Sequence, residues 1–335
     1  MKLEILDCTL RDGGYVNDFL FGENLKIDLL KNLNDSKIEI IELGFLKNGN
    51  HERDSTLYNK INDVYKYINI QNLDSKLSLM IRPDWYDINL LEKDISNSIG
   101  ILRFAFHLKD LELTLHQAEI SRSLGYEIYL NPVNITSYSD LDLVRLLKKI
   151  DSFKPEGASV VDTFGSLLPN KFKNIINLFD KYLSKDIKLG IHLHENLSLS
   201  MGLASIFLEK FYGKRNIIID SSLNGMGRIP GNLPTELISS FLNKEYYKNY
   251  DLQKILYGID RYIIDFKKHN NWGYLPAYSK SAIEFVHRSY AEYFYNNGLK
   301  LDEVFVAIEK IKSTNFLNEF NEELAFKVLN SLHNE

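Results

Sequence analysis

The segment Leu6–Gly14, with the sequence LDCTLRDGG, places an arginine, an aspartate and a pair of glycines directly after a short apolar run. Far downstream, Gly190–His194 has the sequence GIHLH. Alternate residues of a β-strand point to the same face, so His192 and His194 can bind one ion together if this segment is extended. The two segments supply an acidic metal ligand, a cation and two imidazoles. Their joint occurrence predicts a metalloenzyme whose site lies at the ends of strands.

Each of these residues also has an ordinary structural interpretation. Asp12 can cap a helix or stabilise the turn at Gly13 and Gly14. The histidines can be hydrogen-bonded core imidazoles, and Arg11 can form a buried ion pair with Asp7 or Glu42. The metal interpretation is favoured because an isolated histidine pair would not come with an acidic ligand and a cation.

Composition narrows the class of protein. The chain has 335 residues and a net charge of −5, with basic and acidic residues intermixed, so we expect neither a nucleic-acid partner nor a membrane partner. Cys8 is the only cysteine, which excludes an intramolecular disulfide and a thiolate zinc site. No apolar run approaches the roughly 20 residues needed to span a bilayer, and the first residues lack a signal-peptide core. We therefore expect a cytoplasmic protein that acts on small molecules.

Short runs rich in apolar and β-branched residues alternate with stretches of helical spacing, at intervals of roughly 25 to 40 residues. This alternation predicts a parallel α/β architecture, and eight such units favour a (β/α)8 TIM barrel over a doubly wound sheet. The eight runs are Leu3–Thr9, Ile38–Phe45, Leu77–Ile81, Ile101–Phe106, Glu127–Asn131, Ala158–Thr163, Lys188–His194 and Asn216–Leu223.

Polar residues discriminate between the two architectures. A barrel builds its site from the C-terminal ends of many strands, whereas an open sheet concentrates it at one switch point. The candidates fall at or just after the ends of many runs, which favours the barrel. They are Asp7, Arg11, Asp12, Glu42, Arg82, His107, Asn131, Asp162, His192, His194 and Asn224.

The last part of the chain has a different pattern. After about Tyr250 the strand signal disappears, and amphipathic segments follow at Ala282–Asn296 and Leu301–Ile311, with Gly298 as a helix stop. We predict a catalytic barrel over residues 1–250 and a helical C-terminal domain over residues 251–335.

The motifs also resemble those of a known family. The segment Asp7–Gly13 resembles the signature of the metal-dependent lyase barrels that include hydroxymethylglutaryl-CoA lyase, isopropylmalate synthase and 4-hydroxy-2-oxovalerate aldolase. The aldolase branch fits best; the resemblance is strong over residues 1–240 and fainter at Ser289–Tyr293. Four further motifs agree in order: Glu42–Gly44, Asp162–Gly165, His192–Leu197 and Asn224–Asn232.

The resemblance implies roles for individual residues. Asp12, His192 and His194 would bind a divalent ion, with Asn232 as a candidate fourth ligand. Mixed oxygen and imidazole ligation favours Mn²⁺, with Mg²⁺ or another divalent ion as alternatives. Arg11 would bind the oxygen that becomes an enolate, and the carry-over makes Tyr290 the residue that exchanges a proton with the enolate carbon.

Two departures from the family pattern matter. The aldolases have a histidine three residues after the metal aspartate as the base, and this chain has Tyr15 there. Tyrosine is a poor base at neutral pH, so Tyr15, His107 and a metal-bound water all remain candidates. Acyl-CoA lyases carry a catalytic cysteine in the loop that corresponds to Asn224–Asn232, and its absence speaks against acyl-CoA cleavage.

These features predict a metal-dependent aldolase, a carbon–carbon lyase, that cleaves or forms a 4-hydroxy-2-oxo acid through a pyruvate enolate. The alternatives are an acyl-CoA-dependent Claisen synthase or lyase of the same superfamily, and a non-catalytic partner subunit. Relatives of the aldolase pair with an aldehyde dehydrogenase, so we expect such a partner, or a homo-oligomer, through the C-terminal domain. The aldehyde is left open: Gly225–Gly231 with Arg228 suits phosphate binding or simply tight packing, and a phosphorylated or sugar-derived aldehyde is as consistent as acetaldehyde.

Overall fold

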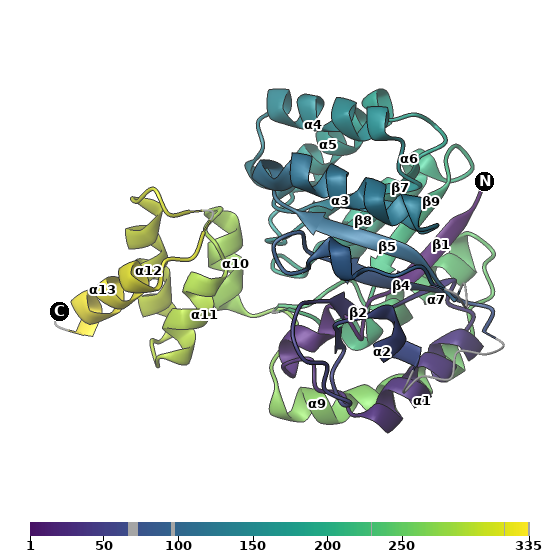
Figure 1. Ribbon diagram of the computed structural model, residues 1–335. Helices are drawn as coiled ribbons and strands as arrows, with labels where there is room; N and C mark the ends of the chain where they lie inside the picture. Colours follow the sequence, from purple (N-terminus) through teal and green to yellow (C-terminus); the bar gives the residue numbers. More distant parts are fainter. Residues whose placement is uncertain (66–72, 95–97, 229, 318, 334–335) are drawn as a thin grey trace.

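The computed structural model describes residues 1–335 except 66–72, 95–97, 229, 318 and 334–335. Parallel strands close into a barrel in the order β1, β9, β8, β7, β6, β5, β4, β2, and β1 pairs with β2 to complete the circle (Figure 1). A short additional strand, β3 (Leu57–Tyr58), pairs with the end of β2. The predicted (β/α)8 barrel is confirmed, and each of the eight predicted runs corresponds to one barrel strand. These strands are β1 (Leu3–Asp7), β2 (Ile40–Leu46), β4 (Lys76–Ile81), β5 (Ile99–Phe106), β6 (Glu127–Pro132), β7 (Gly157–Asp162), β8 (Lys188–Leu193) and β9 (Ile217–Ser221).

Side-chain alternation divides each strand between the barrel interior and the surrounding helices. On β5, for example, Ile101 lies in an interior cluster, whereas Leu102 and Phe104 belong to the larger core between strands and helices. Parallel strands that are covered on both faces are expected to be apolar on both. The interior apolar cluster consists of Leu6, Cys8, Ile40, Ile101, Tyr129 and Ile218.

Amphipathic helices surround the barrel and bury one face each. On α5 the buried residues are Phe172, Ile175, Ile176 and Phe179, at the spacing of a single helical stripe. The surrounding helices are α1 (Glu23–Asp35), the short α2 (Ile61–Tyr65), α3 (Leu111–Ser123), α4 (Asp140–Phe153), α5 (Pro169–Tyr182), α6 (Ser200–Phe211) and α7 (Thr235–Glu245).

The chain then continues into helices of two kinds. Helix α8 (Leu252–Gly258), a π-helical turn (Ile259–Ile263) and α9 (Ile264–His269) pack on the barrel. Ile255, Ile259 and Ile263 belong to the barrel's core, and the partly buried Ile264 of α9 packs against it. A separate core begins only at Ala277 and joins α10 (Pro276–Ile283), α11 (Ser289–Asn296), α12 (Leu301–Lys312) and α13 (Glu322–His333). The two cores therefore divide later in the chain than the expected boundary at residue 250. We call α10–α13 the bundle.

The bundle lies beyond the end of the barrel to which β5 points (Figure 1). The segment Ala282–Asn296, predicted as one amphipathic stretch, is interrupted between α10 and α11, where Phe285 has a φ of 56°. This interruption turns His287 and Arg288 toward the barrel, where both line the pocket described below.

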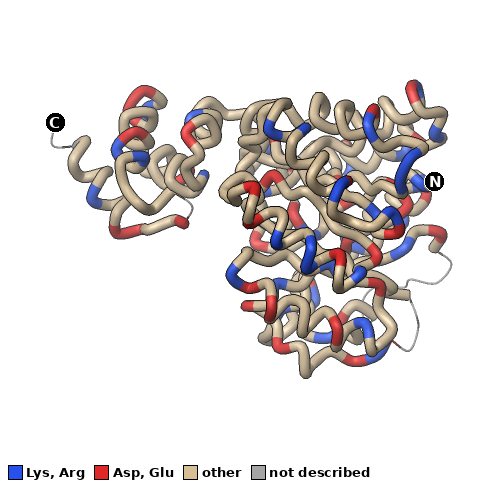
Figure 2. Tube along the Cα trace, turned by 90° about the horizontal axis from the view of Figure 1, so that it is seen from above, with Lys and Arg blue, Asp and Glu red and all other residues tan. Residues whose placement is uncertain are grey.

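Charged residues of both signs are interspersed over the barrel and the bundle (Figure 2). Within the part of the chain that the structure describes, every helix is too short or too polar to cross a membrane.

Candidate metal centre and pocket

The barrel interior becomes charged toward the C-terminal ends of the strands. On β2, β5 and β9, the side chain two residues beyond the interior apolar cluster is Glu42, Arg103 and Asp220, respectively. Residues two apart on a strand share a face, so these three buried side chains meet inside the barrel. Arg103 donates from Nη1 to Glu42 Oε1 (3.2 Å), and from Nη2 to Asp220 and to Asn131 Oδ1 (3.1 Å). We call Glu42, Arg103 and Asp220 the charged floor.

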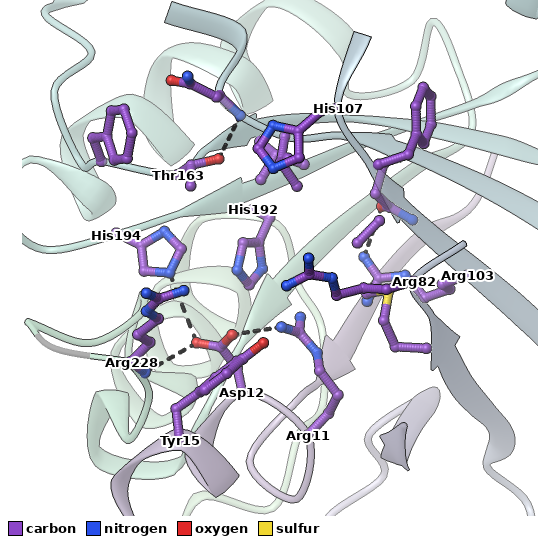
Figure 3. A pocket seen from close by; sticks show the side chains of 18 of the residues that line it. Arg11, Asp12, Tyr15, Arg82, Arg103, His107, Thr163, His192, His194 and Arg228 are labelled. Carbon is purple, nitrogen blue, oxygen red and sulfur yellow. Dashed lines mark hydrogen bonds and ion pairs between the residues drawn. The ribbon is translucent and has the colours of Figure 1, made fainter. Parts of the chain in front are cut away.

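Above the charged floor, the structure brings together the three residues that were predicted to bind a metal. Asp12 lies in the turn after β1, His192 near the end of β8, and His194 just beyond it. One ligand atom from each lies within 4.8 Å of the others, and all three side chains are buried. Figure 3 shows them around one side of the pocket, with His194 Nε2 3.7 Å from Asp12 Oδ2.

Hydrogen bonds hold both imidazoles in the orientation that a metal ligand needs. His192 Nδ1 lies 3.1 Å from Asp220 Oδ2, and His194 Nδ1 lies 2.9 Å from the carbonyl oxygen of Asp162. A proton on each Nδ1 satisfies these acceptors and leaves the Nε2 lone pair free for an ion. Burial lowers the pKa of His194 to about 4, so this imidazole is neutral at physiological pH.

Asp12 is ready to act as an anionic ligand. Burial opposes its ionisation, but Arg11 and the two histidines outweigh that effect and hold its pKa well below the usual range. Its Oδ2 accepts a hydrogen bond from Asn232 Nδ2 at 2.8 Å. A buried carboxylate beside two imidazoles is a donor set that suits a divalent cation.

Asn232 lies beside this cluster, as expected, but the structure turns its amide nitrogen toward Asp12. Its amide oxygen is buried and has no hydrogen-bond partner among the described residues. A half-turn of the amide about its side-chain bond would exchange the two atoms and present the oxygen to an ion. Asn232 as a fourth ligand therefore stays a prediction, and the unpartnered oxygen is the feature that an ion would satisfy.

Arg11 connects the metal cluster to the charged floor. Its Nε donates to Glu42 Oε2 at 2.6 Å and its Nη1 to Asp12 Oδ1 at 2.5 Å. The ion-pair alternative raised by the sequence is thus present, with Glu42 and not Asp7 as the partner. Within the described chain, Nη2 of Arg11 makes no protein hydrogen bond, so one donor of the fork remains for a ligand.

A cavity of about 150 Å³ opens beside the cluster, and Arg11, Asp12, His192 and His194 all line it. A cavity of this size in another protein holds benzene, so this one matches a ligand of roughly six heavy atoms next to the cluster. The cavity is bounded by the barrel on one side and by His287 and Arg288, which precede α11, on the other.

The two expected candidates for the base also line the cavity. Tyr15 is half-buried and packs edge-on against Phe19. His107 lies at the end of β5, where partial burial and Arg82 lower its pKa. Both candidates therefore lie at the pocket, and their positions do not distinguish which of them is the base.

Tyr290 does not reach the pocket. Its side chain is buried in the core of the bundle, where its hydroxyl donates to the carbonyl oxygen of Glu319 (3.2 Å) and accepts from the backbone N–H of Asn321 (3.0 Å). The expectation that Tyr290 exchanges a proton with the enolate carbon is at odds with this placement. The tyrosine stripe on α11 packs the bundle instead.

Sequence reasoning missed four residues of the site. Arg103 and Asp220 each interrupt an apolar run, and a charge inside a buried strand was the available signal. His287 and Arg288 gave no signal, because only the packing of the bundle against the barrel brings them to the cavity.

Comparison with a family model matches residues 111–260 to the family described as HMGL-like. This stretch runs from α3 into the π-helical turn after α8 and contains His192, His194 and Asn232. The chain carries an HMGL-like domain. The superfamily that the motifs resemble is confirmed. The turn after β1, which lies outside the matched stretch, adds Arg11 and Asp12 to the site.

Relatives named as aldolases match most of the chain. The 4-hydroxy-2-oxovalerate aldolase of Bacillus cereus is 24% identical over 258 residues, which cover 76% of this chain and 74% of that protein. The 4-hydroxy-2-oxovalerate aldolase 6 of Rhodococcus jostii is 26% identical over 249 residues, covering 72% and 68%, respectively.

Solved structures show the same fold. The N-terminal domain of a candidate aldolase from Bacteroides vulgatus has a TM-score of 0.76 and 23% identity, covering 88% of this chain and 96% of that chain. The carboxyl transferase domain of Rhizobium etli pyruvate carboxylase, with pyruvate, has a TM-score of 0.70 and 12% identity, covering 99% of this chain and 60% of that chain. The second likeness extends over the bundle that follows the HMGL-like domain.

Proposed function

We propose that this protein is a class II, divalent-metal-dependent aldolase that cleaves or forms a 4-hydroxy-2-oxo acid through the enolate of pyruvate. The observation that carries the proposal is the cluster of Asp12, His192 and His194, with a free donor of Arg11 in the same cavity. Relatives that cover most of the chain are named 4-hydroxy-2-oxovalerate aldolase. A structural neighbour was solved with pyruvate, which supports a 2-oxo acid as the ligand class.

Asp12, His192 and His194 would hold the ion, with Asn232 as the fourth protein ligand after rotation of its amide. The donor set suits Mn²⁺, with Mg²⁺ or another divalent ion as the alternatives. A bound divalent ion supplies a Lewis acid that polarises the keto group of a 2-oxo acid.

Arg11 would stabilise the negative charge that develops on the keto oxygen when the enolate forms. Glu42 fixes the guanidinium through Nε and Asp12 fixes it through Nη1. The position of Nη2 is therefore set before the substrate binds, so binding costs no further side-chain entropy. The guanidinium stays charged because Glu42 and Asp12 outweigh the effect of its burial.

The proton on the C4 hydroxyl of the substrate needs a base. We propose His107, because its lowered pKa keeps most of the imidazole in the neutral, proton-accepting form at physiological pH. In cleavage, the hydroxyl loses its proton to the base, the C3–C4 bond breaks, and its electron pair becomes the enolate while the aldehyde leaves. A proton added at C3 completes pyruvate. Tyr15 is the alternative base, and the same assay on His107→Gln and Tyr15→Phe separates the two.

Both substrates, a 2-oxo acid and an aldehyde, are small molecules, and the cavity of about 150 Å³ matches the size of pyruvate. An aldehyde dehydrogenase or a second copy of this chain, bound through the bundle, stays our expectation for a protein partner.

The test is release of pyruvate from 4-hydroxy-2-oxo acids by the purified protein, measured with added Mn²⁺, after chelation by EDTA, and after Mn²⁺ is restored. We expect activity that is lost on chelation and recovered with the metal. Activity that is unaffected by chelation in protein shown to be metal-free would contradict the metal-dependent mechanism.

A further inference from the structure

Arg82 is a cavity residue to which the function proposed above gives no role. It follows β4 directly and belongs to the polar residues that the sequence places at the ends of strands. It lines the cavity together with Arg11 and the metal cluster. Figure 3 shows its guanidinium pointing into the pocket from the side opposite His194. A ligand bound in the cavity is therefore within reach of this side chain.

A tight turn folds the chain around this guanidinium. The backbone N–H of Trp85 donates to the carbonyl oxygen of Arg82 at 2.9 Å, which closes a β-turn with Pro83 at its second position. Proline is favoured there because its ring fixes φ near the value that the turn needs. Gln117 Nε2 donates to the carbonyl oxygen of Pro83 (3.3 Å), and the backbone N–H of Asn48 donates to that of Trp85 (3.0 Å). These contacts hold the turn in place from two neighbouring segments.

Two side chains of the turn fix the orientation of the Arg82 guanidinium. Asp84 accepts a hydrogen bond from Nε with Oδ1 (3.1 Å) and one from Nη2 with Oδ2 (2.7 Å). The centre of the Trp85 ring lies 4.2 Å from Cζ of Arg82, so the indole packs against the guanidinium. A bidentate ion pair and an aromatic contact together restrict a side chain that otherwise has many rotamers. The guanidinium is therefore oriented before a ligand binds.

The pair with Asp84 occupies only one edge of this guanidinium. A guanidinium has five N–H donors in a planar fork, and Asp84 uses the edge that Nε and Nη2 share. The edge at the tip, formed by Nη1 and the second N–H of Nη2, remains, and Nη1 has no hydrogen-bond partner among the described residues. Arg103 differs, because its Nη1 and Nη2 are engaged by Glu42 and Asp220 in the charged floor. Arg82 can therefore bind a further pair of oxygens.

The size of the cavity indicates which group these donors meet. Its volume of about 150 Å³ holds about six heavy atoms, the number in pyruvate, so a pyruvate at the metal cluster also reaches the other walls. In the proposed function, the ion and Arg11 act on the keto oxygen, and the methyl carbon accepts no hydrogen bond. The carboxylate is the remaining polar group. Its two coplanar oxygens match the paired N–H donors at the edge of a guanidinium.

We propose that Arg82, oriented by Asp84 and Trp85, binds the carboxylate of the 2-oxo acid through Nη1 and Nη2 and selects this acid over uncharged ketones of the same shape. This inference rests on the proposed aldolase function. Arg82 would hold C1 of the substrate, while Arg11 stabilises the charge that develops on the keto oxygen at C2. The carboxylate keeps its charge throughout the reaction, so Arg82 binds the substrate and the transition state alike. Such an interaction contributes to KM more than to kcat.

The test follows exchange of the C3 protons of pyruvate with deuterium in the Mn²⁺-loaded protein, as a function of pyruvate concentration. We expect Arg82→Gln to raise the KM for pyruvate by about 10- to 100-fold, the usual effect of losing hydrogen bonds to a charged group, with a smaller effect on kcat. Arg82→Lys keeps the charge but loses the planar edge, so its KM should lie between those of Arg82→Gln and the wild type. Pyruvamide, an uncharged molecule of the same shape, should inhibit the exchange almost equally in the wild type and in Arg82→Gln.

Two controls separate binding of the carboxylate from a structural role. The Mn²⁺ content of Arg82→Gln, measured by elemental analysis, should equal that of the wild type, because the side-chain hydrogen bonds of Arg82 in the described chain go to Asp84 and not to the metal cluster. Arg145→Gln removes an equal charge from the exposed face of α4 and should leave the KM for pyruvate unchanged.

Several outcomes would overturn this role of Arg82. A KM for pyruvate in Arg82→Gln close to that of the wild type would show that the carboxylate binds elsewhere. Equal losses of affinity for pyruvate and pyruvamide, or a loss of bound Mn²⁺, would make Arg82 a structural residue. If the wild type shows no exchange, the aldolase proposal fails, and calorimetric titration of the Mn²⁺-loaded protein with oxamate, an unreactive analogue of pyruvate, still tests the subsite. Binding that Arg82→Gln weakens supports it, and binding that is unchanged or absent excludes it.

Discussion

At the scale of single residues, the site depends on side chains whose orientation is fixed by a neighbour. Arg11 is fixed by Glu42 and Asp12, and His192 is fixed by Asp220. The residue types of the metal cluster could be predicted from the sequence, because alternation on a strand places His192 and His194 on one face. The role of Tyr290 could not, because only the packing of α11 shows that its hydroxyl is used inside the bundle.

Arg11→Lys tests the fixed guanidinium. Lysine keeps the charge but loses the planar fork, so a single ammonium nitrogen cannot reproduce the separate contacts that Nε, Nη1 and Nη2 make to Glu42, Asp12 and a substrate oxygen. We expect kcat for pyruvate release to fall by about 10²- to 10³-fold, with bound metal nearly unchanged by elemental analysis. Turnover close to that of the wild type would show that Arg11 is only structural.

Asp220→Asn tests how His192 is oriented. His192 Nδ1 and Arg103 Nη2 both donate to Oδ2 of Asp220, so an amide oxygen could keep both contacts, but the substitution removes the negative charge that strengthens them. We expect Mn²⁺ affinity to fall by about 10- to 100-fold, measured by calorimetry. Unchanged affinity would mean that His192 does not ligate the ion.

At the scale of elements, β2, β5 and β9 each contribute an apolar residue to the interior and a charged one two positions later. The period of two is visible in the sequence on β2, β5 and β9, so the charged floor was predictable in principle. The ion pairs within the charged floor were not predictable, because the register between strands decides which carboxylate lies next to Arg103.

Arg103→Met tests the charged floor. Removing the cation leaves Glu42 and Asp220 buried without their shared partner. We expect the free energy of unfolding, measured in urea, to fall by about 3–5 kcal/mol. The loss should be smaller when Asp220→Asn is already present, and strictly additive losses would argue against direct coupling.

At the scale of the whole molecule, the cavity is completed by the bundle. The sequence predicted a barrel followed by helices, but the division of the cores at Ala277 and the turn that presents His287 depend on tertiary packing. Local patterns do not encode such contacts between distant segments, so the bundle's contribution to the site could not be predicted.

His287 makes the stability of the folded protein depend on pH. Its pKa is about 3 in the folded protein, against 6.5 for the free side chain, so below pH 6.5 the unfolded chain binds a proton that the folded one excludes. Stability due to His287 is therefore present above pH 6.5 and is lost as the pH falls toward 3. His287→Asn keeps the acceptor for Ser289 but cannot titrate, so we expect the wild type to lose stability relative to this variant over that range.

The comparison with the variant is needed because two buried carboxyls act in the opposite sense. Burial raises the pKa of Asp7 to about 6 and that of Asp162 to about 7, so their protonation favours the folded state as the pH falls. Urea denaturation of the metal-free protein from pH 4 to pH 7 gives the difference in the free energy of unfolding between the wild type and His287→Asn. Parallel curves for wild type and variant would show that His287 does not stay neutral in the folded protein.

The most direct test of the central claim is the exchange of the C3 protons of pyruvate with deuterium, followed by proton NMR, because it isolates enolate formation from the choice of aldehyde. We predict exchange in the wild type that requires Mn²⁺, stops on chelation, and is nearly abolished in Asp12→Asn and His194→Ala. Absence of exchange in metal-loaded wild-type protein, or exchange that persists in both variants, would contradict a pyruvate enolate formed at the Asp12, His192 and His194 cluster.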